Sequence, residues 1–411
     1  MSNMLIAQSG GPTAAINASL SGAIQEAIRS GEIGQVYGAL NGVEGMLAGT
    51  IIDLRAQFSR QEDFTILECT PAMALGSCRF RLPQEEEDPA LYQKIDGIFR
   101  RYDIGYFFYI GGNDSMDTVD KLSRHFARTG QDIRIIGIPK TIDNDLPGTD
   151  HSPGFGSAAK FIATSVLEII RDCYVYDTDS VTIVEIMGRN AGWLAASAAL
   201  PRTVGARAPH LIYLPEVVFD PEQFIRDVKE ILSLTRNCIV AVSEGVRLSD
   251  GTFAAENFQS GVVDAFGHRY LSGVGKYLEA LVRDKVGCKV RSIELNVLQR
   301  CSSHLLSATD VREARKIGSY AIRFALQGQT GVMMVFERVS NRPYMVRIGC
   351  RPVAEIANRE QLVPRAWINK QGNDITEEMF DYLLPLIEGE VSHPTQNGMP
   401  QHFVLEKSIV G

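Results

Sequence analysis

The sequence lacks the residue patterns that identify several common classes of protein. It has no Cys-x-x-Cys pair and no His-Glu-x-x-His motif, so nothing indicates a zinc site. Its seven cysteines are an odd number and lie scattered along the chain, which argues against a disulfide framework and indicates reduced thiols in a cytoplasmic protein. No apolar run approaches the roughly 20 residues that a membrane-spanning helix needs, so no membrane partner is expected.

The signatures of common nucleotide-binding proteins are also missing. There is no Gly-x-Gly-x-x-Gly motif, which argues against a Rossmann oxidoreductase, and the segment Gly273–Tyr277 lacks the spacing and the hydroxyl residue of a P-loop. An excess of basic residues is absent too. The net charge of -8 and the pI of about 5.5 argue against nucleic acid or an anionic membrane as a partner. The first residues have no basic region before their short apolar run, so we expect a first strand there and no secretory signal.

Short apolar runs alternate with segments of helical periodicity along most of the chain, which predicts an α/β protein. We expect two Rossmann-like three-layer domains with parallel-rich sheets, and an active site in the cleft between them. The first domain is predicted to comprise residues 1–150 and about 263–330, and the second about 151–262. Residues from about 331 to 411 are predicted to form a C-terminal extension packed on the core.

Several segments carry more specific predictions. The glycine-rich region from Asn41 to Gln84 is expected to be irregular. A helix is expected from Ala265 to Val282, and a strand from Arg291 to Val297 is expected to return the chain to the first domain. Within the extension, two strands are expected to form a hairpin around Ser340–Pro343, and an amphipathic helix is expected from Thr376 to Ile387.

Two of the predicted strands end at loops whose residues suit phosphate chemistry. The strand Tyr106–Ile110 is followed by GGNDS (111–115), and the strand Ile133–Ile138 is followed by PKTIDND (139–145). The carboxyl ends of parallel strands meet at one edge of a sheet, so glycines, a lysine and carboxylates are expected close together. That combination indicates phosphoryl transfer. On these residues alone, ordinary turn glycines and capping aspartates stay open as an alternative.

Seven short motifs are spread over residues 4 to 327. They are SGGPTAAIN (9–17), GSCRF (76–80), GGNDS (111–115), PKTIDND (139–145), MGR (187–189), SEG (243–245) and LQR (298–300). In its order and spacing this set resembles the phosphofructokinase family, and TIDND together with MGR is highly specific. The segment after Gly328 has no matching motif.

Within that family the chain looks like the pyrophosphate-dependent branch, because Asp114 and Lys140 stand where ATP-dependent members usually carry glycine. By this resemblance, Asp114 projects a carboxylate into the space of a nucleotide's α-phosphate. Two like charges ~4 Å apart at an effective dielectric constant of ~20 cost about 4 kcal/mol, roughly a thousandfold in affinity. Lys140 supplies positive charge to diphosphate, which has no nucleoside to help it bind.

The resemblance implies a reversible reaction. A phosphoryl group passes from diphosphate to the 1-hydroxyl of fructose 6-phosphate, giving fructose 1,6-bisphosphate and phosphate. Asp143 is implied to be the general base and Arg189 to stabilise charge on the transferring group, with Lys140 and Asp114 completing the catalytic set. The residues implied to bind substrate are Gly11, Thr141, Ile142, Asp143, Met187, Gly188, Arg189, Glu244, Val297, Leu298, Gln299, Arg300 and Arg291. The first domain is implied to bind the donor and the second the sugar phosphate.

The chain departs from the family pattern at a few positions. The family implies Mg²⁺ and often has aspartate where this chain has Asn113. A magnesium ion is therefore expected to be held mainly by diphosphate and water, with Asn113 or Asp114 assisting. Ser180 replaces an arginine that in many ATP-dependent members reaches a neighbouring subunit's substrate. Arg291 matches a second such arginine, so a site shared within a homodimer or homotetramer stays possible. Val297 replaces an aromatic residue or histidine, and only a backbone or apolar contact is expected from it.

Two alternative functions stay open at this point. One is an ATP-dependent 6-phosphofructokinase of the same family, and the other is a non-catalytic regulatory subunit that only binds sugar phosphate. The presence of Lys140, Asp143 and Arg189 argues against the second. The acceptor is also open, because sedoheptulose 7-phosphate has the same reacting end as fructose 6-phosphate.

Overall fold

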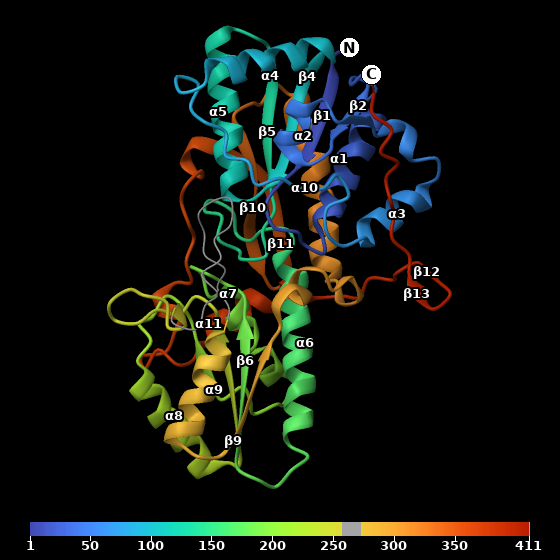
Figure 1. Ribbon diagram of the computed structural model, residues 1–411. Coiled ribbons are helices and arrows are strands. Elements are labelled where there is room, and N and C mark those ends of the chain that lie inside the picture. Colours follow the sequence, from blue (N-terminus) through green and yellow to red (C-terminus); the bar gives the residue numbers. More distant parts are fainter. Residues whose placement is uncertain (257–272, 411) are drawn as a thin grey trace.

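The chain forms two stacked α/β domains (Figure 1). The structure is a computed structural model that describes residues 1–256 and 273–410. The first domain contains both ends of the described chain and lies above the second in the figure. Helix α6 (Phe155–Cys173) runs from the junction of the domains along the length of the second.

The first domain is built on a seven-stranded sheet with the order β11-β10-β5-β4-β1-β2-β3. All neighbours pair in parallel except the two edge pairs, β10–β11 and β2–β3, which are antiparallel. The strands are β1 (Asn3–Gln8), β2 (Val36–Ala39), β3 (Ile51–Asp53), β4 (Ile104–Gly111), β5 (Arg134–Pro139), β10 (Val332–Asn341) and β11 (Tyr344–Pro352).

Helices cover both faces of this sheet. On β1, Met4 and Ile6 pack with α1 (Ile16–Ser30), α3 (Gln61–Cys69) and α10 (Ala308–Leu326). Leu5 and Ala7 pack on the opposite face with the helices α2 (Gly42–Ala48), α4 (Pro89–Arg101) and α5 (Asn113–Thr129). Because side chains alternate between the faces of a strand, a strand covered on both faces has an unbroken apolar sequence.

The second domain contains a four-stranded parallel sheet with the order β7-β8-β6-β9. Its strands are β6 (Ser180–Ile186), β7 (Leu211–Tyr213), β8 (Asn237–Ser243) and β9 (Lys289–Glu294). One face packs with α6, α7 (Trp193–Ser197) and α11 (Glu377–Leu383), and the other with α8 (Pro221–Leu234) and α9 (Val274–Lys285). The remaining elements of the described residues are two hairpin strands, β12 (Thr395–Gln396) and β13 (Met399–Pro400), and seven 3-10 turns. The turns are η1 (Arg55–Gln57), η2 (Leu200–Val204), η4 (Asn296–Arg300), η5 (Ser303–Leu305), η6 (Val353–Glu355), η7 (Arg365–Trp367) and η8 (Leu384–Ile387).

The predicted fold class is confirmed, but the structure differs from the sequence analysis in how segments are shared between the domains. Strand β9 pairs with β6, so the segment containing Arg291 belongs to the second sheet and not the first. Strand β10 pairs with β5, so the predicted hairpin of the extension completes the first sheet. An apolar pattern shows that a segment is a strand, but the choice of partner depends on contacts far away in sequence.

Two further segments differ from expectation. The region 41–84 contains α2, β3 and α3, whose short apolar patterns are interrupted by glycines such as Gly42 and Gly49. The predicted helix Ala265–Val282 begins outside the described residues, and its described part is α9. The described parts of the chain contain no helix with the length and apolar character needed to cross a membrane. All seven cysteines are free thiols.

A buried polar network joins the loop after β5 to α10 and β10. The ring of His151 lies between two carboxylates, with Nδ1 2.8 Å from Asp150 Oδ2 and Nε2 2.8 Å from Glu313 Oε2. The ring stacks on Phe336, and Arg338 donates to Asp150 from the other side. Burial disfavours the charged ring, but the hydrogen bonds to both carboxylates outweigh it and raise the pKa of His151 to about 9.

This network predicts a particular dependence of stability on pH. The folded-state pKa of His151 exceeds its ordinary value of 6.5, so its stabilising charge is fully present below about pH 6.5 and is lost as pH rises through about 9. At pH 7, His151→Gln is expected to lower the free energy of unfolding by about 3 kcal/mol, because it removes the cation between two buried carboxylates. Urea unfolding of both proteins at pH 6.5 and 9 measures this. The difference between them should shrink at pH 9, and an unchanged difference would contradict the assignment.

Candidate functional site

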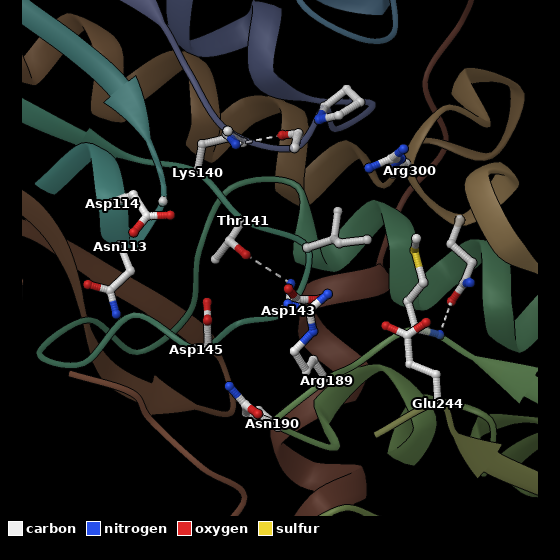
Figure 2. A pocket seen from close by; sticks show the side chains of 18 of the residues that line it. Asn113, Asp114, Lys140, Thr141, Asp143, Asp145, Arg189, Asn190, Glu244 and Arg300 are labelled. Atoms are coloured by element: carbon white, nitrogen blue, oxygen red, sulfur yellow. Dashed lines mark hydrogen bonds between the residues drawn. The ribbon is translucent and has the colours of Figure 1, made fainter. Parts of the chain in front are cut away.

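A cavity of about 810 Å³ lies between the two domains and is lined by residues of both. Figure 2 shows the side chains of 18 of the residues that line it. From the first domain come the loops that follow β1, β4 and β5. From the second come the loops that follow β6 and β8, together with η4. The carboxyl ends of parallel strands from both sheets therefore meet at one cleft, the usual location of ligand sites in such sheets.

Glycine loops and a helix N-terminus form the upper wall of the cavity. Gly10 has a φ of +81°, a conformation that residues with side chains rarely adopt. A Cβ atom at Gly10 would also lie 3.2 Å from the ammonium of Lys140. Helix α5 begins at Asn113, directly after Gly112, so the unpaired amide N–H groups of its first turn lie at the cavity wall. Such a terminus is suited to bind an anion.

Lys140 is a buried cation in this wall, at the end of β5. Its side chain is almost fully buried, and its ammonium donates a hydrogen bond of 2.6 Å to the carbonyl oxygen of Gly11 (Figure 2). Burial lowers the pKa of Lys140 to about 8, although Asp143 and Asp145 oppose the shift. The ammonium is therefore mostly charged at pH 7 and titrates just above it.

Asp143 and Asp145 enter the cavity from the loop after β5. Between them, Asn144 has a left-handed backbone with a φ of 57°, and its amide bonds the hydroxyl of Tyr382 at 2.7 Å and the N–H of Ser152 at 2.9 Å. This anchor fixes the loop, and the N–H of Asp143 also donates to Thr141 Oγ1 at 3.1 Å. The residues on either side of Asn144 thereby line the cavity.

Burial and the neighbouring charges together shift the pKa values of these two carboxylates. Burial raises the pKa of Asp143, while the cations Arg189, Lys140 and Arg300 act to lower it. Burial raises the pKa of Asp145 to about 7, with the charge of Asp143 as the next cause. A carboxylate with a raised pKa is a stronger base than an exposed one, which suits proton abstraction.

The lower wall is a set of interlocked loops in the second domain. Gly188 has a φ of +135°, and its N–H donates to Glu244 Oε1 at 3.3 Å. A Cβ atom at Gly245 would lie 2.0 Å from the carbonyl oxygen of Arg189, so only glycine allows these loops to pack so closely. The N–H of Met187 donates to Gln299 Oε1 at 3.1 Å. Burial raises the pKa of Glu244 to about 8, so this carboxyl can carry a proton near neutral pH.

Most of the residues predicted from sequence do meet at this cavity. Three do not line it. Gly188 lies behind the wall, Leu298 is 55% exposed on η4, and Arg291 lies on β9 with its guanidinium 2.6 Å from Asp172 Oδ2. The predicted residues that line the cavity are Gly11, Asn113, Asp114, Lys140, Thr141, Ile142, Asp143, Met187, Arg189, Glu244, Val297, Gln299 and Arg300.

Asn113 has a different environment from the one expected for a magnesium ligand. Its side-chain oxygen accepts a 2.6 Å hydrogen bond from the N–H of Asn358, and its side-chain nitrogen donates at 2.6 Å to the carbonyl oxygen of Arg359. Both ends of the amide are therefore held by the C-terminal extension. Within the described residues, no group of three or more His, Cys, Asp or Glu side chains is placed to hold a metal ion.

Several residues that line the cavity were not predicted from the sequence. Arg79 and Glu185 sit in or beside the recognised motifs, so their positions gave a usable signal. Asn358 and Glu360 come from the extension, which has no motif, and only the folded chain brings them to the cleft. The other residues missed are Ile186, Asn190, Ala191, Glu294 and Asn296.

Comparison with known proteins finds a matching family, similar proteins and a similar solved structure. The family described as Phosphofructokinase matches residues 3–325. A protein of Halomonas elongata named pyrophosphate–fructose 6-phosphate 1-phosphotransferase is 43% identical over 99% of this chain and 97% of its own length. A protein of the same name from Methylococcus capsulatus is 42% identical over 98% and 96%. The crystal structure of pyrophosphate-dependent phosphofructokinase from Nitrosospira multiformis matches with a TM-score of 0.88 and 37% identity, covering 100% of this chain and 98% of that one.

Proposed function

The chain belongs to the phosphofructokinase family, and we infer that it transfers a phosphoryl group reversibly from diphosphate to the 1-hydroxyl of fructose 6-phosphate. The products are fructose 1,6-bisphosphate and phosphate, a step of glycolysis and gluconeogenesis. Full-length relatives at 40–43% identity carry the corresponding name, which supports diphosphate as the donor.

The observation that carries the choice of donor is the presence of both Asp114 and Lys140 in the cavity wall. Asp114 lies on the first turn of α5, and Figure 2 shows its carboxylate pointing into the cavity. Lys140 reaches the same wall from the end of β5. The negative charge of Asp114 repels the additional phosphate of ATP, and the buried positive charge of Lys140 attracts diphosphate.

The residue roles in our proposal follow from their positions. Asp143 accepts the proton of the 1-hydroxyl of fructose 6-phosphate while that hydroxyl oxygen attacks one phosphorus atom of diphosphate. The bridging P–O bond of diphosphate breaks as the new P–O bond forms, and phosphate leaves. Lys140, Arg189 and Arg300, whose charges all act on Asp143, neutralise the oxygens of the transferring group. In the reverse direction Asp143 returns the proton to the sugar oxygen.

Magnesium is also a proposal. Mg²⁺ commonly keeps several waters and binds through substrate phosphates with one or two carboxylates. The cavity fits this mode, because it offers the exposed carboxylate of Asp114 and no cage of three acidic or histidine side chains among the described residues. When bound, the ion would supply charge neutralisation for diphosphate. Asn113 is proposed only to assist, through the second lone pair of the side-chain oxygen that accepts from Asn358.

Three features stay predictions. A homodimer or homotetramer is one, and Arg291 is available for a shared site because it lies outside its own cleft and is about half exposed. A cytoplasmic location is the second. The third is the strictness of the acceptor, since sedoheptulose 7-phosphate presents the same reacting end.

Donor choice is testable by steady-state kinetics. The wild-type protein is expected to turn over diphosphate, with kcat/KM for ATP lower by roughly a thousandfold or more, the equivalent of about 4 kcal/mol of like-charge repulsion. Asp114→Gly is expected to raise kcat/KM for ATP. The matched control is Asp120→Gly, on the same helix with its carboxylate paired to Arg124. Wild-type activity with ATP and none with diphosphate would reject the proposal.

The role of Asp143 predicts a change in kcat. Asp143→Asn keeps the shape of the side chain but cannot accept the proton, so kcat is expected to fall by about 10² to 10⁴ with little change in KM. Purified wild type and variant are compared at saturating substrates, with thermal unfolding as a check on folding. A variant that keeps wild-type kcat would exclude Asp143 as the base. A wild type without turnover would favour the regulatory-subunit alternative.

Lys140 predicts a pH dependence of donor binding. Its lowered pKa of about 8 means that the ammonium loses its charge as pH rises through 8, so KM for diphosphate should increase there. Lys140→Arg keeps its charge throughout that range, and its KM should rise less between pH 7 and 9. The ionisation of diphosphate itself is common to both proteins and cancels in the comparison. Parallel KM profiles would contradict the assignment.

A further inference from the structure

The C-terminal extension contributes a segment that crosses the cleft, which we call the strap and define as residues 358–363. It lies between η6 and η7 and has no regular secondary structure of its own. Two of its residues, Asn358 and Glu360, line the catalytic cavity. The strap lies beyond residue 325, where the match to the family ends, so the family comparison assigns it no role.

One end of the strap is fixed to the first domain. Asn113, the first residue of α5, bonds the backbone of Asn358 and Arg359 with both ends of its amide, each at 2.6 Å. One turn further along the same helix, Asp117 accepts a 3.1 Å hydrogen bond from the side chain of Asn358. This end of the strap is therefore attached to the helix that carries Asp114.

The middle of the strap is fixed to the loop that carries the base. The N–H of Gln361 donates a 2.7 Å hydrogen bond to the carbonyl oxygen of Asp145, two residues after Asp143. A shift of the strap would therefore move the backbone that presents Asp143 to the cavity.

The other end is fixed to the second domain. The indole N–H of Trp193 donates to the carbonyl oxygen of Gln361 at 3.0 Å, and the N–H of Val363 donates to Glu216 Oε1 at 2.9 Å. Most directly, Asn190 Nδ2 donates to Glu360 Oε1 at 2.7 Å. Asn190 follows Arg189 in sequence, and its side-chain oxygen accepts from Arg247 at 3.3 Å, so its amide is held from two sides.

We propose that the strap sets the relative position of the two catalytic loops, and that Glu360 is the positioning residue that holds Asn190, and through it Arg189, opposite Asp143. Phosphoryl transfer depends on placing the base on the attacking hydroxyl while the cation lies on the transferring phosphoryl group, and a displacement of about 1 Å can cost about a hundredfold in rate. Glu360 acts here as a hydrogen-bond acceptor. The inference rests on the proposed function for its assay, but its geometry does not depend on which donor is used.

The test compares substitutions at Glu360 that separate hydrogen bonding from charge. Glu360→Ala removes the acceptor and is expected to lower kcat by about tenfold to a hundredfold while KM for diphosphate changes less than about threefold. Glu360→Gln keeps an oxygen that can accept from Asn190 and should stay within about threefold of wild-type kcat. The matched control is Glu355→Ala, an exposed glutamate on η6 that does not line the cavity.

A double-mutant cycle tests the contact itself. Asn190→Ala should reproduce the loss of kcat, and Glu360→Ala with Asn190→Ala should be no worse than either change alone. The proposal is overturned if Glu360→Ala has the same kcat as Glu355→Ala. It is also overturned if Glu360→Gln loses as much kcat as Glu360→Ala, or if the two losses in the cycle are additive. A wild type inactive with diphosphate overturns the proposed function alone, and the same series is then measured with ATP.

Discussion

The catalytic cleft depends on one buried cation, the ammonium of Lys140. It is almost fully buried and bonds the carbonyl oxygen of Gly11, which joins the loop after β5 to the turn after β1. A buried charge needs compensation, and Asp143 and Asp145 provide it from the adjoining loop. Compensation is partial, because the pKa of Lys140 is still lowered and that of Asp145 is raised. The cleft thus holds groups of both signs that titrate near neutral pH, as reversible phosphoryl transfer with proton transfer requires.

Close backbone packing is the second constraint. Gly10 lies against Lys140, and Gly245 lies against the carbonyl of Arg189, so a side chain at either position would displace a charged residue of the site. The glycines of the recognised motifs therefore serve positioning as much as anion binding. The hydrogen bond from Asn144 to Tyr382 also positions the site. Through it the C-terminal extension supports the loop that carries Asp143.

The extension is where sequence reasoning was least informative. Its hairpin was predicted, but its place as β10 and β11 of the first sheet was not. The hydrogen bonds by which Asn113 holds the strap were not predicted, and neither was Glu360. No local pattern marks such residues, because the partner lies 245 positions away along the chain for Asn113 and 170 positions away for Glu360.

The sequence by itself determined the α/β class and the loops that line the cavity, and it led to the proposal that Asp114 and Lys140 favour diphosphate over ATP. It could do so because strand periodicity, glycine turns and the charges that follow them are local properties of the chain. Tertiary structure alone decided that β9 joins the second sheet, that Arg291 lies outside its own cleft, and that the extension crosses the cleft beside Arg189 and Asp145. These outcomes depend on pairings between distant segments, and periodicity reports how deeply a residue is buried without reporting what it is buried against.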